Sequence, residues 1–105
     1  METQHIIAAL AALAQESRLA AFRLLVQTGP EGLAASRIAE QLDISPSSLS
    51  FHLKELSHAG LISARQDGRF IIYSANFDTM NGVLSFLTEN CCGGAPCAVN
   101  TSCCL

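Results

Sequence analysis

The stretch "SPSSLSFHLKELSHAG" (residues 45–60) carries the clearest helix signals in the chain. Ser45 is a favourable N-cap, and Pro46 suits the first helical position because the backbone N–H that proline lacks has no partner there in any case. Gly60 suits the position just after a helix, where a left-handed backbone is common. Between them, leucines recur at helical spacing, so the sequence predicts an amphipathic helix that is buried through Leu49, Leu53 and Leu56.

Three further helices are expected upstream. Apolar residues recur every three or four positions from Thr3 to Ala14, which is the stripe of an amphipathic helix. Ser17 is the expected N-cap of a second helix, which ends at "TGPEG" (residues 28–32). A short third helix is expected within "AASRIAEQL" (residues 34–42), and only a tight turn separates it from the helix at 45–60.

After residue 60 the apolar pattern changes to a period of two. The runs "LISAR" (61–65) and "RFIIYSA" (69–75) are separated by "QDG", and an Asp-Gly pair between such runs predicts a hairpin turn. A final helix is expected from about Asp78 to Glu89. This order of elements predicts a mainly α-helical winged helix-turn-helix with a β-hairpin wing.

The polar face of the helix at 45–60 is the candidate DNA-binding surface. Serine hydroxyls near a helix N-terminus can donate to phosphates and base edges, although they could equally serve only to keep the helix hydrated. The hairpin tip "RQDGR" would bring two arginines toward a phosphate backbone or a minor groove. The candidate DNA contacts are therefore Ser45, Ser47, Ser48, Ser50, His52, Lys54, Arg65 and Arg69.

Charge limits how strongly one subunit could bind DNA. The formal net charge is -3, so any positive field must be local. Between Ile44 and Ala75 the basic residues Lys54, Arg65 and Arg69 exceed the acidic residues only slightly. Moderate affinity per subunit is expected, and a dimer that binds two half-sites would compensate.

Length and composition indicate one domain and no membrane association. The chain has 105 residues, half of them apolar, so its core is modest and a partner subunit would help to stabilise it. No run reaches the ~18 apolar residues of a membrane span. The apolar "IIAALAALA" (residues 6–14) has no Lys or Arg before it, unlike a secretory signal. We expect a cytoplasmic protein with reduced thiols.

The cysteines are confined to the C-terminal segment. The chain has five cysteines, and none lies before residue 91. We therefore expect a DNA-binding and dimerisation domain at residues 1–90 and a Cys-rich tail at residues 91–105. The tail contains Cys91, Cys92, Cys97, Cys103 and Cys104.

Residues 9 to 87 resemble the ArsR family of metal-sensing transcriptional repressors. The resemblance lies in the pattern "LA…SRL…LL" of the second predicted helix, in "IAEQLDIS", and above all in "SLSFHLKELSHAGLI". It implies a homodimer with the first and last helices at its interface. It also implies that the protein binds operator DNA without inducer and releases it when a metal ion or metalloid binds.

The inducer sites of this family differ in position. The commonest arsenic site resembles "CxC" in the third helix, where this chain has no cysteine. A zinc-type site draws Asp and His from the last helix, and here Asp78 has no histidine beside it. The third known arrangement is an adjacent cysteine pair just past the last helix with another cysteine a few residues on. Cys91, Cys92 and Cys97 match that arrangement.

The chemistry of the tail favours a soft ion. Thiolates select soft ions and metalloids, and three sulfurs complete the pyramidal shell of trivalent arsenic or antimony. Gly93, Gly94 and Pro96 would allow a tight loop that returns Cys97 to the pair. Cys103 and Cys104 are auxiliary candidates, either as ligands of a second ion or for organoarsenicals such as methylarsenite.

Several alternatives to a trivalent metalloid stay open. Zinc or cadmium would prefer four ligands, and the tail has no CxxC spacing. A thiol redox switch is a second alternative, although no Lys, Arg or His lies in the tail to lower a thiol pKa. A third alternative is a tail without function. A fourth is a cysteine-dependent enzyme, but no histidine has an evident path to a tail cysteine.

Overall fold

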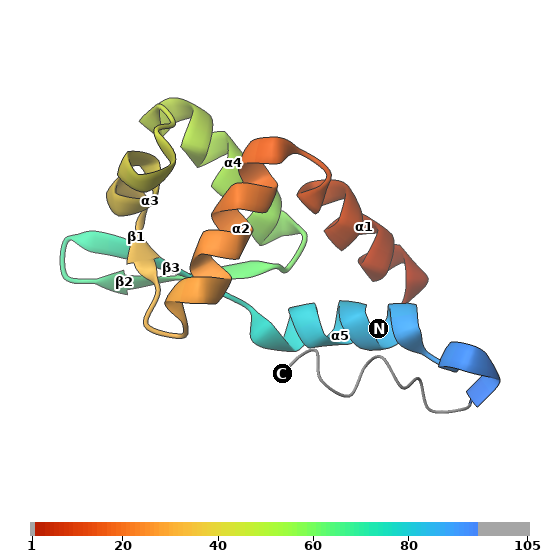
Figure 1. Ribbon diagram of the computed structural model, residues 1–105. Helices are drawn as coiled ribbons and strands as arrows, with labels where there is room; N and C mark the ends of the chain where they lie inside the picture. Colours follow the sequence, from red (N-terminus) through yellow and green to blue (C-terminus); the bar gives the residue numbers. More distant parts are fainter. Residues whose placement is uncertain (1, 95–105) are drawn as a thin grey trace.

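The computed structural model describes residues 2–94 and has the order of elements that the sequence predicts, with one added strand (Figure 1). A short irregular turn at Cys91–Gly94 follows the last α-helix. The elements are α1 (Thr3–Leu13), α2 (Glu16–Thr28), β1 (Leu33–Ala34), α3 (Ala35–Leu42), α4 (Pro46–His58), β2 (Ile62–Asp67), β3 (Phe70–Ala75) and α5 (Phe77–Thr88).

Helix α4 forms as the sequence predicts. The Ser45 side chain accepts a hydrogen bond from the Ser48 backbone N–H at 3.3 Å, and Pro46 occupies the first turn. Gly60 follows the C-cap residue with a φ of 77°, as a left-handed C′ residue should. The three leucines of the apolar face are almost fully buried, so the predicted orientation of this helix is confirmed.

The N-cap of α2 was predicted at the wrong residue. The helix begins at Glu16, and the side chain of Gln15 accepts a hydrogen bond from the Arg18 backbone N–H at 2.9 Å. Ser17 therefore lies inside the first turn rather than capping it. The longer Gln15 side chain makes the capping contact two residues earlier, which a preference scale for caps does not anticipate.

The hairpin turn is shifted by one residue from the predicted Asp-Gly pair. Asp67 pairs with Phe70, so the two loop residues are Gly68 and Arg69. Gly68 has a φ of 64°, which suits the first central position of a two-residue hairpin loop. Gly68 of the predicted pair has the positive φ of a turn residue, but Asp67 is the last residue of strand β2.

Strand β1 was not predicted, and it turns the hairpin into a three-stranded antiparallel sheet of order β1-β3-β2. Leu33 pairs with Tyr73 and Ala34 with Ile72. A two-residue strand is too short to show a periodic pattern in the sequence. Gly32 precedes it with a φ of 71°, and a Cβ there would overlap the Tyr73 carbonyl oxygen. The absence of a side chain lets the two backbones approach.

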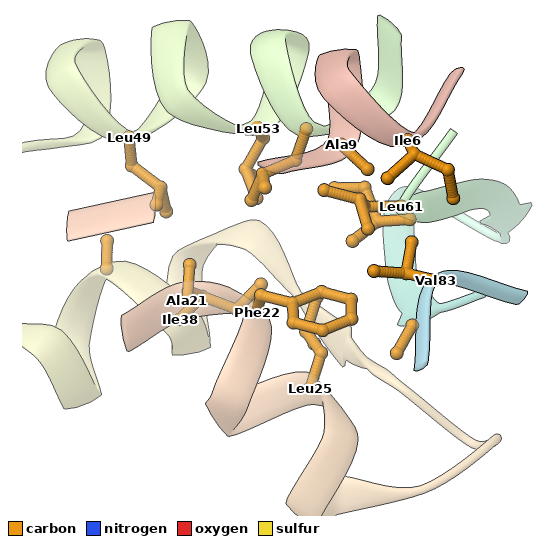
Figure 2. Packing of buried hydrophobic residues seen from close by; sticks show 14 residues of the cluster. Ile6, Ala9, Ala21, Phe22, Leu25, Ile38, Leu49, Leu53, Leu61 and Val83 are labelled. Carbon is orange, nitrogen blue, oxygen red and sulfur yellow. The ribbon is translucent and has the colours of Figure 1, made fainter. Parts of the chain in front are cut away.

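The core lies between α2, α4 and the strands, and α1, α3 and α5 cover it from outside. Figure 2 shows Leu49 and Leu53 of α4 directed toward α2, with Leu61 and Val83 on one side of the same cluster. Among the described residues no polar or charged side chain is buried. None of the helices described between residues 2 and 94 is both long and apolar enough to span a membrane.

Helices α1 and α5 are buried less completely than their apolar stripes predict. In α1 only Ile6 and Ala9 are buried, and Leu10 is 41% exposed. In α5 only Val83 is buried, while Leu84 is 54% exposed. The rest of this chain does not cover these side chains, because each helix packs against the domain through one narrow edge of its apolar stripe.

Candidate DNA-binding surface and cysteine turn

The exposed face of α4 carries most of the predicted DNA contacts. Ser47, Ser50 and Lys54 are exposed and lie at helical spacings of three and four residues, so they form one stripe along the helix. The N-terminal end of α4 adds the positive end of the helix dipole. Hydroxyls and one cation on one exposed surface suit contacts to phosphates and base edges.

Two predicted contacts on α4 have additional structural roles. Ser45 caps the helix through its side-chain oxygen. His52 is half-buried, and its Nδ1 lies 3.4 Å from Nη1 of Arg18 in α2. Arg18 also donates from Nε to the carbonyl oxygen of Ala12 in α1 at 2.7 Å. One arginine therefore connects the C-terminal end of α1 to the middle of α4, an arrangement that the sequence did not predict.

The two wing arginines differ in their surroundings. Arg65 lies opposite Ile72 in the hairpin and donates from Nη2 to the carbonyl oxygen of Glu31 at 2.7 Å. It therefore ties the wing to the loop before β1. Arg69 occupies the hairpin loop and is exposed. Of the two arginines that the sequence placed at the tip, only Arg69 lies in the loop, whereas Arg65 lies within strand β2.

Exposed apolar side chains also lie on the α4 face and the wing. Phe51 is 56% exposed in α4, and Phe70 and Ile71 are 58% and 42% exposed in β3. The sequence placed Phe51 on the polar face of α4 but gave it no role. The exposed positions of Phe70 and Ile71 follow from their place near the end of the hairpin, beyond the strand β1 that pairs with β3.

A second exposed surface is apolar and lies on α1 and α5. Leu10, Leu84 and Leu87 border a groove of about 360 Å³ whose wall is completed by α2 residues such as Leu19 and Phe22. Ile7 of α1 is also 59% exposed. We call the exposed set Ile7, Leu10, Leu84 and Leu87, together with Leu19 at the start of α2, the α1/α5 face. Contiguous exposed apolar surface of this kind marks an interaction site in soluble proteins.

The cysteine turn follows α5 directly. The Sγ atoms of Cys91 and Cys92 lie 3.4 Å apart, a separation for two thiols rather than for a disulfide, whose sulfurs lie about 2.05 Å apart. The backbone is left-handed at Asn90, Cys92 and Gly93, with φ of 59°, 57° and 70°. A left-handed cysteine is uncommon, and such residues concentrate at functional sites.

The other predicted ligands lie outside the described residues, namely Cys97, Cys103 and Cys104. Within residues 2–94 no group of three His, Cys, Asp or Glu side chains is arranged to hold a metal ion. Asp78 is exposed in the first turn of α5. Of the predicted cysteine ligands, the structure thus brings together Cys91 and Cys92.

The candidate DNA-binding surface lies at one end of the molecule, and the α1/α5 face with the cysteine turn lies at the other. In Figure 1 the hairpin tip, α3 and the start of α4 lie on the left, whereas α1, α5 and the turn after α5 lie on the right.

Comparison with known proteins identifies the DNA-binding unit. Residues 13–64 match a family model described as a helix-turn-helix domain. The chain is 38% identical over 78 residues to the uncharacterised HTH-type transcriptional regulator YceK of Bacillus subtilis, covering 74% of this chain and 77% of the relative.

Two further relatives differ in the roles that their names give. The chain is 36% identical over 81 residues to the arsenical resistance operon repressor of Bacillus subtilis, covering 77% of this chain and 73% of the relative. It is 34% identical over 80 residues to the nodulation protein NolR of Rhizobium meliloti, covering 76% and 63%.

The structure is also similar to solved structures. An ArsR-like transcriptional regulator from Rhodococcus sp. RHA1 superimposes with a TM-score of 0.73 at 28% identity, covering 82% of this chain and 78% of that chain. The winged helix-turn-helix fold predicted from the sequence is therefore confirmed.

Proposed function

Because the chain belongs to the ArsR family of helix-turn-helix transcriptional regulators, we propose that it is a repressor whose operator is released by a trivalent metalloid. The family consists of DNA-binding regulators, not of enzymes. The proposed inducer is trivalent arsenic or antimony, or methylarsenite. The proposed ligands are Cys91, Cys92 and Cys97, with Cys103 and Cys104 as auxiliary thiols.

The observation that carries this proposal is the 3.4 Å separation of the Cys91 and Cys92 sulfurs. Two sulfurs that each lie about 2.3 Å from one ion can be at most about 4.6 Å apart, so this pair could bind a single ion without a large rearrangement. Sulfur is the donor that soft ions prefer over oxygen and imidazole. The family arrangement needs one further sulfur, and Cys97 is the nearest cysteine along the chain.

The names of relatives support an arsenical inducer. A Bacillus subtilis relative is an arsenical resistance operon repressor. The nodulation protein NolR, of similar identity, shows that membership of this group of sequences does not by itself fix the inducer. The cysteines of this chain, rather than its overall similarity, therefore favour the metalloid.

The α1/α5 face supports a homodimer. A second copy placed on this face would cover the exposed leucines Leu10, Leu84 and Leu87. Burial of apolar area is the main favourable contribution to such association. The cysteine turn follows the C-terminal end of α5, so the ion site would lie close to the subunit interface.

The proposed mechanism couples this interface to DNA. Without inducer, the dimer would hold two α4 helices at the spacing of successive major grooves. Ion binding would favour a dimer geometry that fits DNA less well. The two binding events would then oppose each other by the same factor, typically 1–3 kcal/mol of coupling free energy, so operator DNA should weaken ion binding equally.

In this proposal residues 1–90 bind DNA and form the dimer, and residues 91–105 bind the inducer. The hydroxyls and the cation of α4 contact DNA, together with Arg69 in the wing loop. Arg65 contributes indirectly, because its guanidinium fixes the wing against the Glu31 carbonyl. His52 contributes through the position of α4, because it faces Arg18.

A titration with several inducers tests the proposal. Fully reduced protein bound to a fluorescently labelled operator would be titrated with arsenite, antimonite, methylarsenite, cadmium and zinc, and separately with peroxide. Fluorescence anisotropy would follow the release of DNA. We expect release by the trivalent metalloids at the lowest concentrations. Release by zinc or cadmium at lower concentration, or by peroxide alone, would identify the corresponding alternative and reject the metalloid.

Cysteine variants assign the ligands. Cys91→Ser, Cys92→Ser and Cys97→Ser should each bind operator normally but require much more arsenite for release. The double variant Cys103→Ser/Cys104→Ser is the matched control, because it removes two tail thiols and should respond nearly as the parent does. A parent-like arsenite response from Cys97→Ser would show that the proposed triad is wrong.

A further inference from the structure

Phe51 is the one apolar side chain in the exposed stripe of α4. Ser47 lies four residues before it, Ser50 directly before it, and Lys54 three residues after it, so all four share one helical surface. The side chain is 56% exposed, although α4 already buries its leucines in the core. Its position therefore contributes little to packing within the chain, and it stands among side chains suited to DNA.

The Phe51 ring has a neighbour that limits its orientation. Its centroid lies 5.7 Å from that of the His52 ring, with 65° between the planes, in the edge-to-face arrangement that aromatic pairs favour. His52 is in turn 3.4 Å from the Arg18 guanidinium, which also donates to the Ala12 carbonyl oxygen. Helices α1 and α2 thus support the exposed ring through His52.

The major groove offers one apolar group that matches such a ring. Base edges there present hydrogen-bond donors and acceptors, except for the C5 methyl group of thymine, which makes apolar contacts with side chains such as phenylalanine. The serines and Lys54 around Phe51 can donate to neighbouring polar edges and phosphates. An exposed phenylalanine surrounded by donors would therefore favour a thymine over the other bases at one position.

We propose that Phe51 is a specificity-determining residue that contacts a thymine methyl group in the major groove, once in each half-site of the operator. The inference rests on the proposed placement of α4 against DNA and adds the base that α4 selects. The His52 ring and Arg18 are positioning residues for Phe51. Neither needs to touch the thymine.

The test removes the methyl group from the DNA and the ring from the protein. An operator is first selected from a pool of random duplexes with the full-length reduced protein. Each thymine is then replaced singly by deoxyuridine, which keeps the Watson–Crick hydrogen bonds and lacks only the methyl group. Dissociation constants are measured by fluorescence anisotropy at one fixed salt concentration for the parent chain, Phe51→Ala, and Phe70→Ala as the matched control.

The control is matched because Phe70 is 58% exposed, almost as much as Phe51, but lies in the wing. With the parent chain, one thymine per half-site should lose about fourfold in affinity on conversion to deoxyuridine, the value for one buried methyl group. Phe51→Ala should bind both duplexes with equal affinity, while Phe70→Ala should keep the fourfold difference. Circular dichroism of each variant establishes that it is folded.

Two kinds of result would contradict the proposals for Phe51 and for α4. If no deoxyuridine substitution weakens the parent, or if Phe51→Ala retains the discrimination, the role of Phe51 is wrong. Ser47→Ala and Lys54→Ala separate that failure from the failure of the proposed DNA surface. If neither lowers operator affinity, α4 is not the element that contacts the bases, and the proposals for α4 and for Phe51 both fail.

Discussion

Arg18 Nη1 lies 3.4 Å from His52 Nδ1, and this contact joins α2 to the face of α4 that we assign to DNA. A guanidinium has only donors, so a hydrogen bond between these two atoms requires Nδ1 of His52 to act as the acceptor. The Nε atom of Arg18 simultaneously donates to Ala12 at the end of α1. Arg18 thus links α4 to α1, a helix that also forms part of the α1/α5 face.

Replacing Arg18 should weaken DNA binding although Arg18 is not proposed to contact DNA. In Arg18→Met both hydrogen bonds are lost, and if one of them orders α4 the operator dissociation constant should rise about fivefold, the value of one hydrogen bond. Arg18→Lys separates geometry from charge, because an ammonium keeps the charge but lacks the planar fork. We expect it to resemble Arg18→Met in anisotropy titrations. Parent-like affinity of Arg18→Met would reject this positioning role.

The two wing arginines should differ in their salt dependence. Arg69 lies in the hairpin loop. Arg69→Ala would remove one phosphate contact from each subunit of a dimer, so the slope of log K against log salt should become less negative by about two. In Arg65→Ala the slope should change less, because this guanidinium donates to the Glu31 carbonyl oxygen. Titrations at several salt concentrations measure both slopes. A larger change for Arg65→Ala would reverse the assignment.

The two loop glycines of the sheet should respond differently to alanine. Both have positive φ, which costs an alanine about 1 kcal/mol, and that cost is all we expect for Gly68→Ala because nothing lies near its added Cβ. In Gly32→Ala the Cβ would also meet the Tyr73 carbonyl oxygen, so the loss should be about 3 kcal/mol. Urea unfolding at one protein concentration measures both free energies. Equal losses would show that β1 does not need the close approach.

A carboxylate on α5 should separate the proposed dimer. Leu84 is 54% exposed on the α1/α5 face, and in Leu84→Glu an unpaired charge would have to be buried at the interface. The dimer dissociation constant should rise at least ~100-fold, and operator affinity should fall with it. Sedimentation velocity measures the change. Ile71→Glu is the matched control, since Ile71 is 42% exposed on the wing and should leave the dimer intact. A dimeric Leu84→Glu would place the interface elsewhere.

Removal of the metalloid should restore DNA binding. A small dithiol added after arsenite competes for the ion with the thiols of Cys91 and Cys92, so the anisotropy of the labelled operator should return to its starting value. A reagent that reduces disulfides but does not bind metal ions should not restore DNA binding after arsenite. It should restore binding only if release came from oxidation of the cysteines. The pair of reagents therefore distinguishes ion binding from a redox switch.

Local patterns of the sequence were sufficient to predict most of the fold. The cap at Ser45, the leucines of α4 and the left-handed Gly60 depend on interactions within a few residues, and all three are as predicted. The predictions failed where distant contacts decide. Strand β1 exists because Leu33 and Ala34 pair with β3, almost forty residues away, and a segment so short has no pattern of its own.

The candidate sites divide in the same way. The serines and Lys54 of α4 could be assigned to an exposed face from helical spacing alone, and the adjacent cysteines after α5 could be proposed as soft-ion ligands from residue type and order. Sequence did not reveal that Arg65 is bonded to Glu31 or that Arg18 supports His52, because each contact spans 34 residues.

The sequence by itself determined the five helices and the β2–β3 hairpin, the polar face of α4 and the isolation of the thiols after residue 90, because these features follow from residue type and short-range spacing. Only the tertiary structure decided which arginine lies at the wing loop and which apolar side chains stay uncovered. Packing against elements distant in sequence sets both, and it leaves Phe51 exposed beside the side chains that we propose to bind DNA, and the leucines of α5 exposed on the face that we propose for a second subunit.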